Sequence, residues 1–337
     1  MRRHHIVLIA LTLLAMPAPA SAQTSAEARE RAQEARQRTA ERAQERAQRD
    51  NERARERQER ERERERAGAL DTVVTFDARG ALSVNCPGGA VIVTGAARNE
   101  IRVRARTENG GIRFTSNGTR ALLEPTSGRG CSDGSFEVTV PVGTKVTATS
   151  WNGSVRVKGV HGDIEAQSHS GDVDVRDAGE RLDIESLSGD VVVTGVMGES
   201  AINTVSGDVT LTGARGNVSV ESVSGDLDLR DVVAKQVRAH TTSGDVTFAG
   251  AILDAGRYEF NTHSGEVSLA LPSDIGAELS VSTFSGGIES DFPITLKAGE
   301  HGIGVGQAKR LNFTVGRGTA RIVAETFSGD VTLKRRR

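Results

Sequence analysis

Short segments in which apolar and polar residues alternate dominate the chain from residue 70 onward, separated by turns of Gly, Asn and Asp. Residues 91–93, 101–104 and 136–140 are examples. Residues two apart in a strand face the same side of a sheet, so the alternation predicts half-buried β-strands. Residues 69–337 are therefore predicted to form one all-β domain.

A Ser-Gly-Asp turn recurs through this domain at nearly constant spacing. Its glycines, with a degenerate first member, are Gly153, Gly171, Gly189, Gly207, Gly225, Gly244, Gly265, Gly286 and Gly329. Successive glycines lie 18, 18, 18, 18, 19, 21, 21 and 43 residues apart. The spacing of 43 indicates about two repeats with one copy eroded. A fixed period of this length is the signature of a repeat architecture.

Each period contains two predicted strands. Apolar residues stand two apart after the turn, as at Val173 and Val175, and again before the next turn, as at Leu182 and Ile184. A small hydroxyl such as Ser186 follows on the same face. Neither strand can bury its apolar side alone, whereas stacked periods enclose a continuous core of Val, Ile and Leu.

These features predict a right-handed parallel β-solenoid, with two strands per coil of 18–21 residues and about 4.8 Å between coils. The longer C-terminal periods indicate wider coils or bulges. The alternative is an antiparallel meander, which needs neither a constant period nor one recurring turn sequence.

The first 22 residues have the pattern of a secretory signal peptide. Arg2 and Arg3 begin a positive segment, residues 6–16 are apolar, and Ala20-Ser21-Ala22 supplies a small-residue cleavage site. The apolar run is shorter than the roughly 20 residues that span a bilayer, although an uncleaved anchor is the alternative. The prediction is cleavage after Ala22 and a periplasmic or secreted protein with no transmembrane segment in the mature chain.

Residues 23–68 form a second region, rich in alternating Glu and Arg. Two interpretations stay open, a solvated helix or a disordered spacer. The net charge of the 337-residue chain is −2, and no nucleic-acid partner is expected. Aromatic residues make up only 3%, so the core must consist mainly of Val, Ile, Leu and Ala.

Three sets of residues are candidates for chemistry. Cys86 and Cys131 are the only cysteines, and an oxidising compartment favours a disulfide over two free thiols. The aspartates of the turns form a column that either accepts hydrogen bonds, each within its own turn, or binds Ca²⁺. Its members are Asp172, Asp190, Asp208, Asp226 and Asp245.

The third set occupies the position before each turn serine and is largely apolar. It comprises Trp151, His169, Leu187, Val205, Val223, Thr242, His263, Phe284 and Phe327. If this column faces solvent, it offers a stripe for a partner or a glycan, with the aromatic and histidine side chains as its ligand-binding residues. Packing between coils is the alternative.

Residues 136–143, Phe-Glu-Val-Thr-Val-Pro-Val-Gly, followed by serial Ser-Gly-Asp-Val units, resemble a bacterial family of putative adhesins of unknown function. That family carries β-strand repeats and is similar to autotransporter adhesin heads. The resemblance covers about residues 70–337 and implies a cell-envelope solenoid without established catalytic residues.

The expected function is therefore adhesion or scaffolding, with a cell-envelope polymer or protein as the partner, and without catalysis. No Gly-x-Ser-x-Gly elbow is followed by a credible triad. The alternatives are a carbohydrate-active β-helix enzyme, which would need a unique cluster of acids and bases, and an envelope-stress accessory protein.

Overall fold

The computed structural model describes residues 44, 46–53, 55, 68–107, 110–126, 134–293 and 309–336. The chain divides into two units, residues 1–62 and 63–337. In the first unit, residues 46–53 are helical and exposed, as the helical interpretation of the charged region predicts. None of the helices among the described residues is long and apolar enough to cross a membrane. The predicted signal peptide lies outside these residues.

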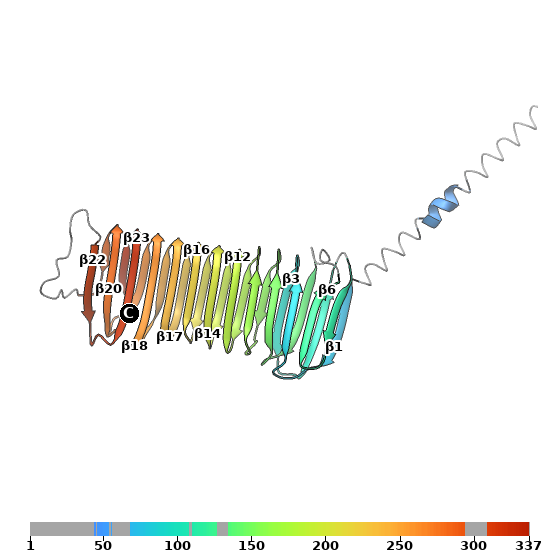
Figure 1. Cartoon of the computed structure of the whole chain (residues 1–337), viewed down its shortest axis with the longest axis horizontal. Coiled ribbons are helices and arrows are strands. Elements are labelled where there is room, and N and C mark those ends of the chain that lie inside the picture. Colours follow the sequence, from blue (N-terminus) through green and yellow to red (C-terminus); the bar gives the residue numbers. More distant parts are fainter. Residues whose placement is uncertain are drawn as a thin grey trace, which may run out of the picture. The chain divides into compact units, whose positions relative to one another are not determined.

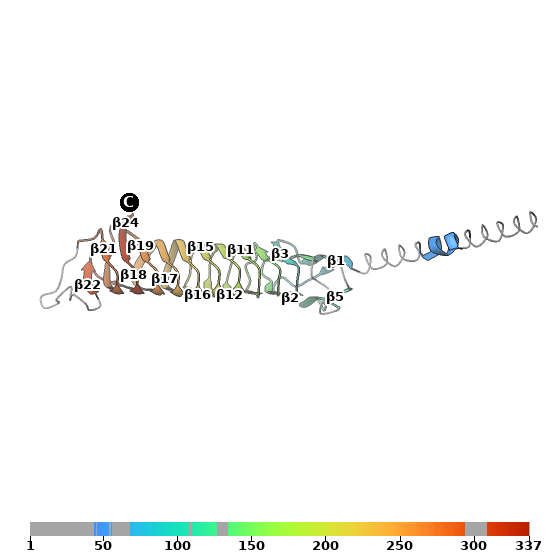
Figure 2. The same ribbon diagram turned by 90° about the horizontal axis from the view of Figure 1, so that it is seen from above.

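The second unit is all-β, and most of its strands stack in parallel into two opposed layers (Figures 1 and 2). The first layer, face A, has the spatial order β6 (Arg120–Pro125), β2 (Ala81–Cys86), β8 (Lys145–Ser150), β10 (Ile164–Ser168), β12 (Arg181–Ser188), β14 (Glu199–Ser206), β16 (Val218–Ser224), the second halves of β17 (Leu227–Ser243) and β18 (Val246–Ser264), β23 (Ala320–Ser328) and β20 (Ala277–Ser285).

The second layer, face B, is built in the same way from the strand that follows each corner. Its order is β7 (Ser135–Pro141), β3 (Ala90–Ala96), β9 (Val155–Lys158), β11 (Val173–Ala178), β13 (Val191–Val196), β15 (Val209–Ala214), the first halves of β17 and β18, β19 (Val267–Pro272), β24 (Val331–Arg336) and β21 (Ile288–Ser290).

The pairing register places equivalent residues of successive periods side by side. Val173 pairs with Val191 and Val191 with Val209, and all three are fully buried. On face A, Ile184 lies between Ala166 and Ile202 in the same manner. The core between the two layers is therefore a set of aliphatic columns, which confirms the all-β, solenoid-like prediction. One pair of strands, one from each face, is called a rung below.

The predicted widening toward the C-terminus is present as irregular register in β17 and β18. The shifts lie between Arg230 and Val232 and between Ala234 and Gln236. Aromatic side chains fill the larger interior: the ring of Phe248 lies 4.8 Å from that of Phe260 and 6.2 Å from that of Tyr258. The Tyr258 hydroxyl donates to the Ala234 carbonyl at 2.8 Å and accepts from the Leu253 N–H at 2.7 Å.

The ends of the stack do not follow sequence order. The last rung, β23–β24, inserts between the rung of β18 and β19 and the rung of β20 and β21 (Figure 1). The N-terminal end mirrors this, because β2–β3 lies between β6–β7 and β8–β9. The prediction of an eroded repeat before Gly329 is wrong: its turn fills a place between those of Gly265 and Gly286.

Antiparallel strands close the two ends, so the prediction of a wholly parallel stack needs a second correction. At the N-terminal end, β1 (Ala69–Thr75) pairs with β4 (Glu100–Arg106), β4 with β7, and β5 (Ile112–Ser116) with β6. At the other end, β22 (Lys309–Val315) pairs with β20. End strands of this kind shield the open edges that a stack of parallel rungs would otherwise present.

The turn glycines are required for two reasons. Gly207 has φ +119°, a region that L-residues rarely adopt. A Cβ added to it would also lie 2.2 Å from the carbonyl oxygen of Gly189 in the preceding rung. The first reason follows from the turn alone, whereas the second exists only because identical corners are stacked.

Candidate functional site: a solvent-facing corner stripe

From β8 to β20, one side chain per rung lines the corner where the face A strand passes into face B, and each is exposed except the half-buried His169. In spatial order these residues, the corner stripe, are Trp151, His169, Leu187, Val205, Val223, Thr242, His263, Phe327 and Phe284. Trp151 is 57% exposed, Phe284 54% and Val223 52%. The stripe faces solvent. The alternative interpretation, packing between coils, applies only to the contacts that stripe residues make with one another.

A buried hydroxyl immediately before each stripe residue fixes this orientation. The Ser168 hydroxyl donates to the Gly171 carbonyl at 2.8 Å, and the Thr262 hydroxyl donates to the Gly244 carbonyl at 2.9 Å. Thr326 does the same toward Gly265. Because the hydroxyl points inward, strand alternation turns the next residue outward.

Rings in the stripe stack on one another along the axis. Trp151 and His169 have centroids 3.8 Å apart and planes 16° apart. At the other end, the Phe327 ring lies 4.8 Å from His263 and 4.7 Å from Phe284, nearly parallel to both. Stacking covers ring faces and leaves ring edges exposed, so the stripe is an apolar ridge with few open ring faces.

The aspartates of the turns form a ladder between rungs. The Asp190 N–H donates to Asp172 Oδ1 at 3.1 Å, and the Asp226 N–H donates to Asp208 Oδ1 at 2.9 Å. Glu266 N–H continues the series by donating to Asp245 Oδ1 at 2.8 Å. The predicted hydrogen bond within each turn is therefore wrong in its partner: the carboxylate accepts from the backbone of the next rung.

No group of three or more His, Cys, Asp or Glu side chains suited to a metal ion occurs among the described residues. In the ladder, one oxygen of each of Asp172, Asp190, Asp208, Asp226 and Asp245 is engaged by a backbone N–H. The Ca²⁺ prediction stays untested by this arrangement.

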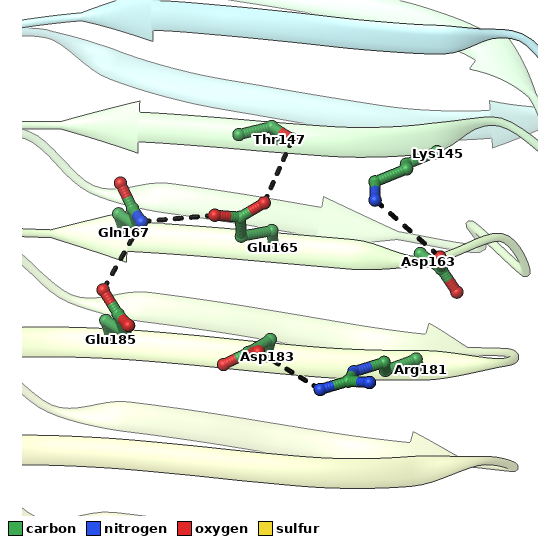
Figure 3. A network of polar contacts seen from close by, with 8 residues as sticks. All are labelled: Lys145, Thr147, Asp163, Glu165, Gln167, Arg181, Asp183 and Glu185. Atoms are coloured by element: carbon green, nitrogen blue, oxygen red, sulfur yellow. Dashed lines mark hydrogen bonds and ion pairs between the residues drawn. The ribbon is translucent and has the colours of Figure 1, made fainter.

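Outside the corner, the polar side chains of face A pair with each other (Figure 3). Gln167 donates to Glu165 at 3.2 Å and to Glu185 at 3.4 Å. Ion pairs join Lys145 to Asp163 at 3.9 Å and Arg181 to Asp183 at 3.7 Å. These contacts link polar side chains of face A within a strand and between neighbouring strands.

A family model described as Toastrack DUF4097 matches residues 90–334, which hold most of the stacked rungs. The chain belongs to the Toastrack DUF4097 family. No match was found among curated proteins.

Solved structures similar to this Toastrack chain include three bacterial proteins of low identity. A putative cell adhesion protein from Clostridium sporogenes is 10% identical with a TM-score of 0.27, and the match covers 80% of this chain and 100% of that chain. A putative adhesin from Bacteroides fragilis is 11% identical with a TM-score of 0.36, and the match covers 78% of this chain and 96% of that chain. A putative lipid binding protein from Parabacteroides distasonis is 8% identical with a TM-score of 0.44, and the match covers 79% of this chain and 97% of that chain.

A shallow hollow of about 570 Å³ runs beside the N-terminal part of the stripe in this Toastrack domain. The stripe residues Trp151, His169, Leu187 and Val205 form one side, and the polar column two positions earlier forms the other. The hollow is not among the sites predicted from the sequence, although both of its walls recur at the repeat period.

Cys86 is fully buried at the end of β2 and is disulfide-bonded. Its predicted partner, Cys131, lies outside the described residues, so the pairing stays a prediction. Cys86 pairs in register with Ser150, directly before Trp151. Cys86 therefore lies beside the corner from which the stripe begins.

Proposed function

We propose that this chain is an exported, non-catalytic binding module of the cell envelope that holds an elongated partner along the corner stripe. The observation that carries the proposal is the stripe itself, in which nearly every rung from β8 to β20 places an apolar or aromatic side chain in water. Continuous exposed apolar surface of this kind marks an interaction site. The partner is an envelope polymer or protein.

The repeat architecture suits such a role. Each rung is held by its neighbours through buried aliphatic columns and by backbone hydrogen bonds, so the side chains of the stripe are positioned before a partner arrives. Binding to a preorganised surface avoids much of the entropy cost of ordering it. In our proposal the rungs form a right-handed coil, as crossover connections between parallel strands favour.

Export is supported by independent features. The basic, apolar and small-residue segments of residues 1–22 fit a cleaved signal peptide, and the buried disulfide at Cys86 fits an oxidising compartment. The proposed location is periplasmic or secreted.

A triple variant of the stripe tests the proposal. Leu187→Thr, Val205→Thr and Val223→Thr make the middle of the stripe polar while keeping the fold, because Thr242 already occupies an equivalent position. Co-sedimentation with envelope fractions of the producing cells should fall at least tenfold. Val192→Thr, at an exposed valine of face B, is the matched control and should bind as wild type does. Equal retention of the triple variant and the wild type would refute the proposal.

A further inference from the structure

Two columns that carry acidic side chains flank the corner stripe. On the face B side, three positions after each stripe residue, they comprise Asp172, Asp190, Asp208, Asp226, Asp245, Glu266 and Asp330, all exposed. On the face A side, two positions before each stripe residue, the column is only partly acidic: it holds Glu185, Glu221 and Glu325, and its other members are Thr, Gln, Asn, His or Ser. No Lys or Arg occupies either flanking column from β8 to β20.

Among the described residues, no ion pair involves the acidic side chains on the face B side. Ion pairs join other side chains, such as Arg238 and Glu259 on face A or Arg176 and Asp174 on face B. On the face A side of the stripe, Arg310 pairs with Glu325 at 3.8 Å. In the ladder, each carboxylate accepts a backbone N–H, which leaves its negative charge in place. The apolar ridge is therefore bordered by an acidic row on the face B side and by Glu185 and Glu221 on the face A side, and a partner must bring the compensating charge.

We infer that the partner is a basic amphipathic polypeptide segment, whose apolar side chains cover the stripe while its Lys and Arg side chains reach the flanking carboxylates. The inference rests on the proposed function and names the partner's chemistry. Acidic glycans and anionic lipid surfaces would meet like charge on both sides. Neutral sugars stack on open ring faces, and most ring faces in the stripe are covered by neighbouring rings.

The length of the stripe sets the scale of the partner. Nine rungs at about 4.8 Å span roughly 40 Å, the length of a helix of about 25 residues. A helix with an apolar face bordered by Lys and Arg presents the complementary order of charges across its width. The probe is therefore a synthetic Lys/Leu amphipathic peptide of this length.

Trp151, the only tryptophan of the chain, reports binding at one end of the stripe. Titration of the full chain with the Lys/Leu peptide should give a saturable change in its emission and a Kd that rises with salt. A Glu/Leu peptide with the same Leu positions should give no saturable change. Binding of the Glu/Leu peptide with similar affinity would overturn the inference, as would saturable binding of phosphatidylglycerol vesicles when the Lys/Leu peptide does not bind.

The charge rows are tested by Asp190→Asn, Asp208→Asn and Asp226→Asn together. Asn Oδ1 still accepts the N–H of the next rung, so the ladder is kept while three charges are removed. Exposed charge pairs contribute a few-fold each, so the Kd for the Lys/Leu peptide should rise about tenfold. Asp174→Asn with Asp228→Asn on face B is the control and should leave the Kd unchanged. An unchanged Kd in the triple variant would refute the role of the rows.

The two proposals can fail separately. If the Leu187, Val205 and Val223 variant loses envelope retention but the Lys/Leu peptide does not bind the wild type, the stripe is a binding site and the inferred charge of its partner is wrong. If retention does not depend on the stripe at all, the proposed function fails, and with it the inference.

Discussion

Replacing one turn glycine by alanine should separate two neighbouring rungs. In Gly207→Ala, the new Cβ would lie 2.2 Å from the Gly189 oxygen and 2.7 Å from its carbonyl carbon. Both are backbone atoms, so the contact is relieved only if the corner opens by about 1 Å toward an ordinary van der Waals distance. The substitution therefore acts on the interface between rungs as well as on its own φ angle.

The cost can be worked out from the bonds at that corner. An L-residue at positive φ costs about 1–2 kcal/mol. Opening also stretches two hydrogen bonds, from the Val191 N–H to the Asp208 carbonyl at 2.9 Å and from the Asp208 N–H to Asp190 Oδ1 at 3.1 Å, each worth about 1 kcal/mol. The free energy of unfolding should fall by about 3–4 kcal/mol.

Variants at two other glycines separate the cost of the positive φ angle from the cost of the contact between rungs. Gly118→Ala has φ +87° and no atom within 4 Å of the added Cβ, so it should lose only the conformational part, about 1–2 kcal/mol. Gly287→Ala, beside the turn of Gly286, has its nearest contact at 3.6 Å and should be close to neutral. Urea unfolding followed by circular dichroism and by Trp151 fluorescence measures all three. A Gly207→Ala protein no less stable than Gly118→Ala would refute the stacking argument.

Three further predictions concern the core and the ladder. Ser200 is buried in an apolar column between Leu182 and Val218, and its hydroxyl has no hydrogen-bond partner among the described residues. Ser200→Val should therefore raise the free energy of unfolding, measured by urea titration, by about 1–2 kcal/mol. A destabilised variant would contradict this. Burial raises the pKa of Tyr258, so its contribution to the free energy of unfolding should be full below pH about 10 and should be lost as pH rises through the higher folded pKa. Absorbance at 295 nm follows the ionisation of this residue, the only tyrosine of the chain. Tyr258→Phe should remove the pH dependence and lower the free energy of unfolding by about 1–3 kcal/mol at neutral pH. Calcium should leave the Tm unchanged in thermal melts, and a large upward shift would instead make the aspartate ladder a metal site.

Local repetition explains what could be predicted from the sequence. A pair of apolar residues such as Val173 and Val175, a hydroxyl such as that of Ser186 and a turn glycine recur at nearly constant spacing along the chain. Each copy therefore indicates the same pattern of burial. Stacking was therefore predictable from side-chain period alone. The longer periods around Phe248 likewise predict wider rungs, because the extra residues interrupt the regular pairing of neighbouring strands.

Features that depend on which rungs are neighbours could not be predicted. The distance from Gly286 to Gly329 equals about two periods, so an eroded repeat and an inserted rung have the same spacing along the chain. The sequence predicts aspartate hydrogen bonds within single turns, because a turn considered alone offers only its own N–H groups. The N–H groups of the next rung become available only through stacking. Strand alternation turns Trp151 away from the core, but whether neighbouring rungs cover its side chain depends on the corner geometry, which the sequence does not show.

The inserted last rung gives the final prediction. Removing residues 320–337 deletes β23 and β24, including the buried Ile322 and Leu333, and leaves β18 and β20 without a partner between them. Unpaired parallel edges promote pairing with other chains, so the truncated protein should form larger assemblies and should lose amide protection over residues 277–290. Light scattering after size exclusion and hydrogen exchange measure the two effects.

Removing only residues 336–337 is the matched control for this truncation, because it keeps the hydrogen bonds of Arg335 to Asp291. It keeps the buried side chains of both strands, and the protein should have the mass and exchange pattern of the full chain. If the longer truncation also left both unchanged, the rung of β20 and β21 would have to dock directly on that of β18 and β19. The order of the rungs at this end would then not depend on the last segment.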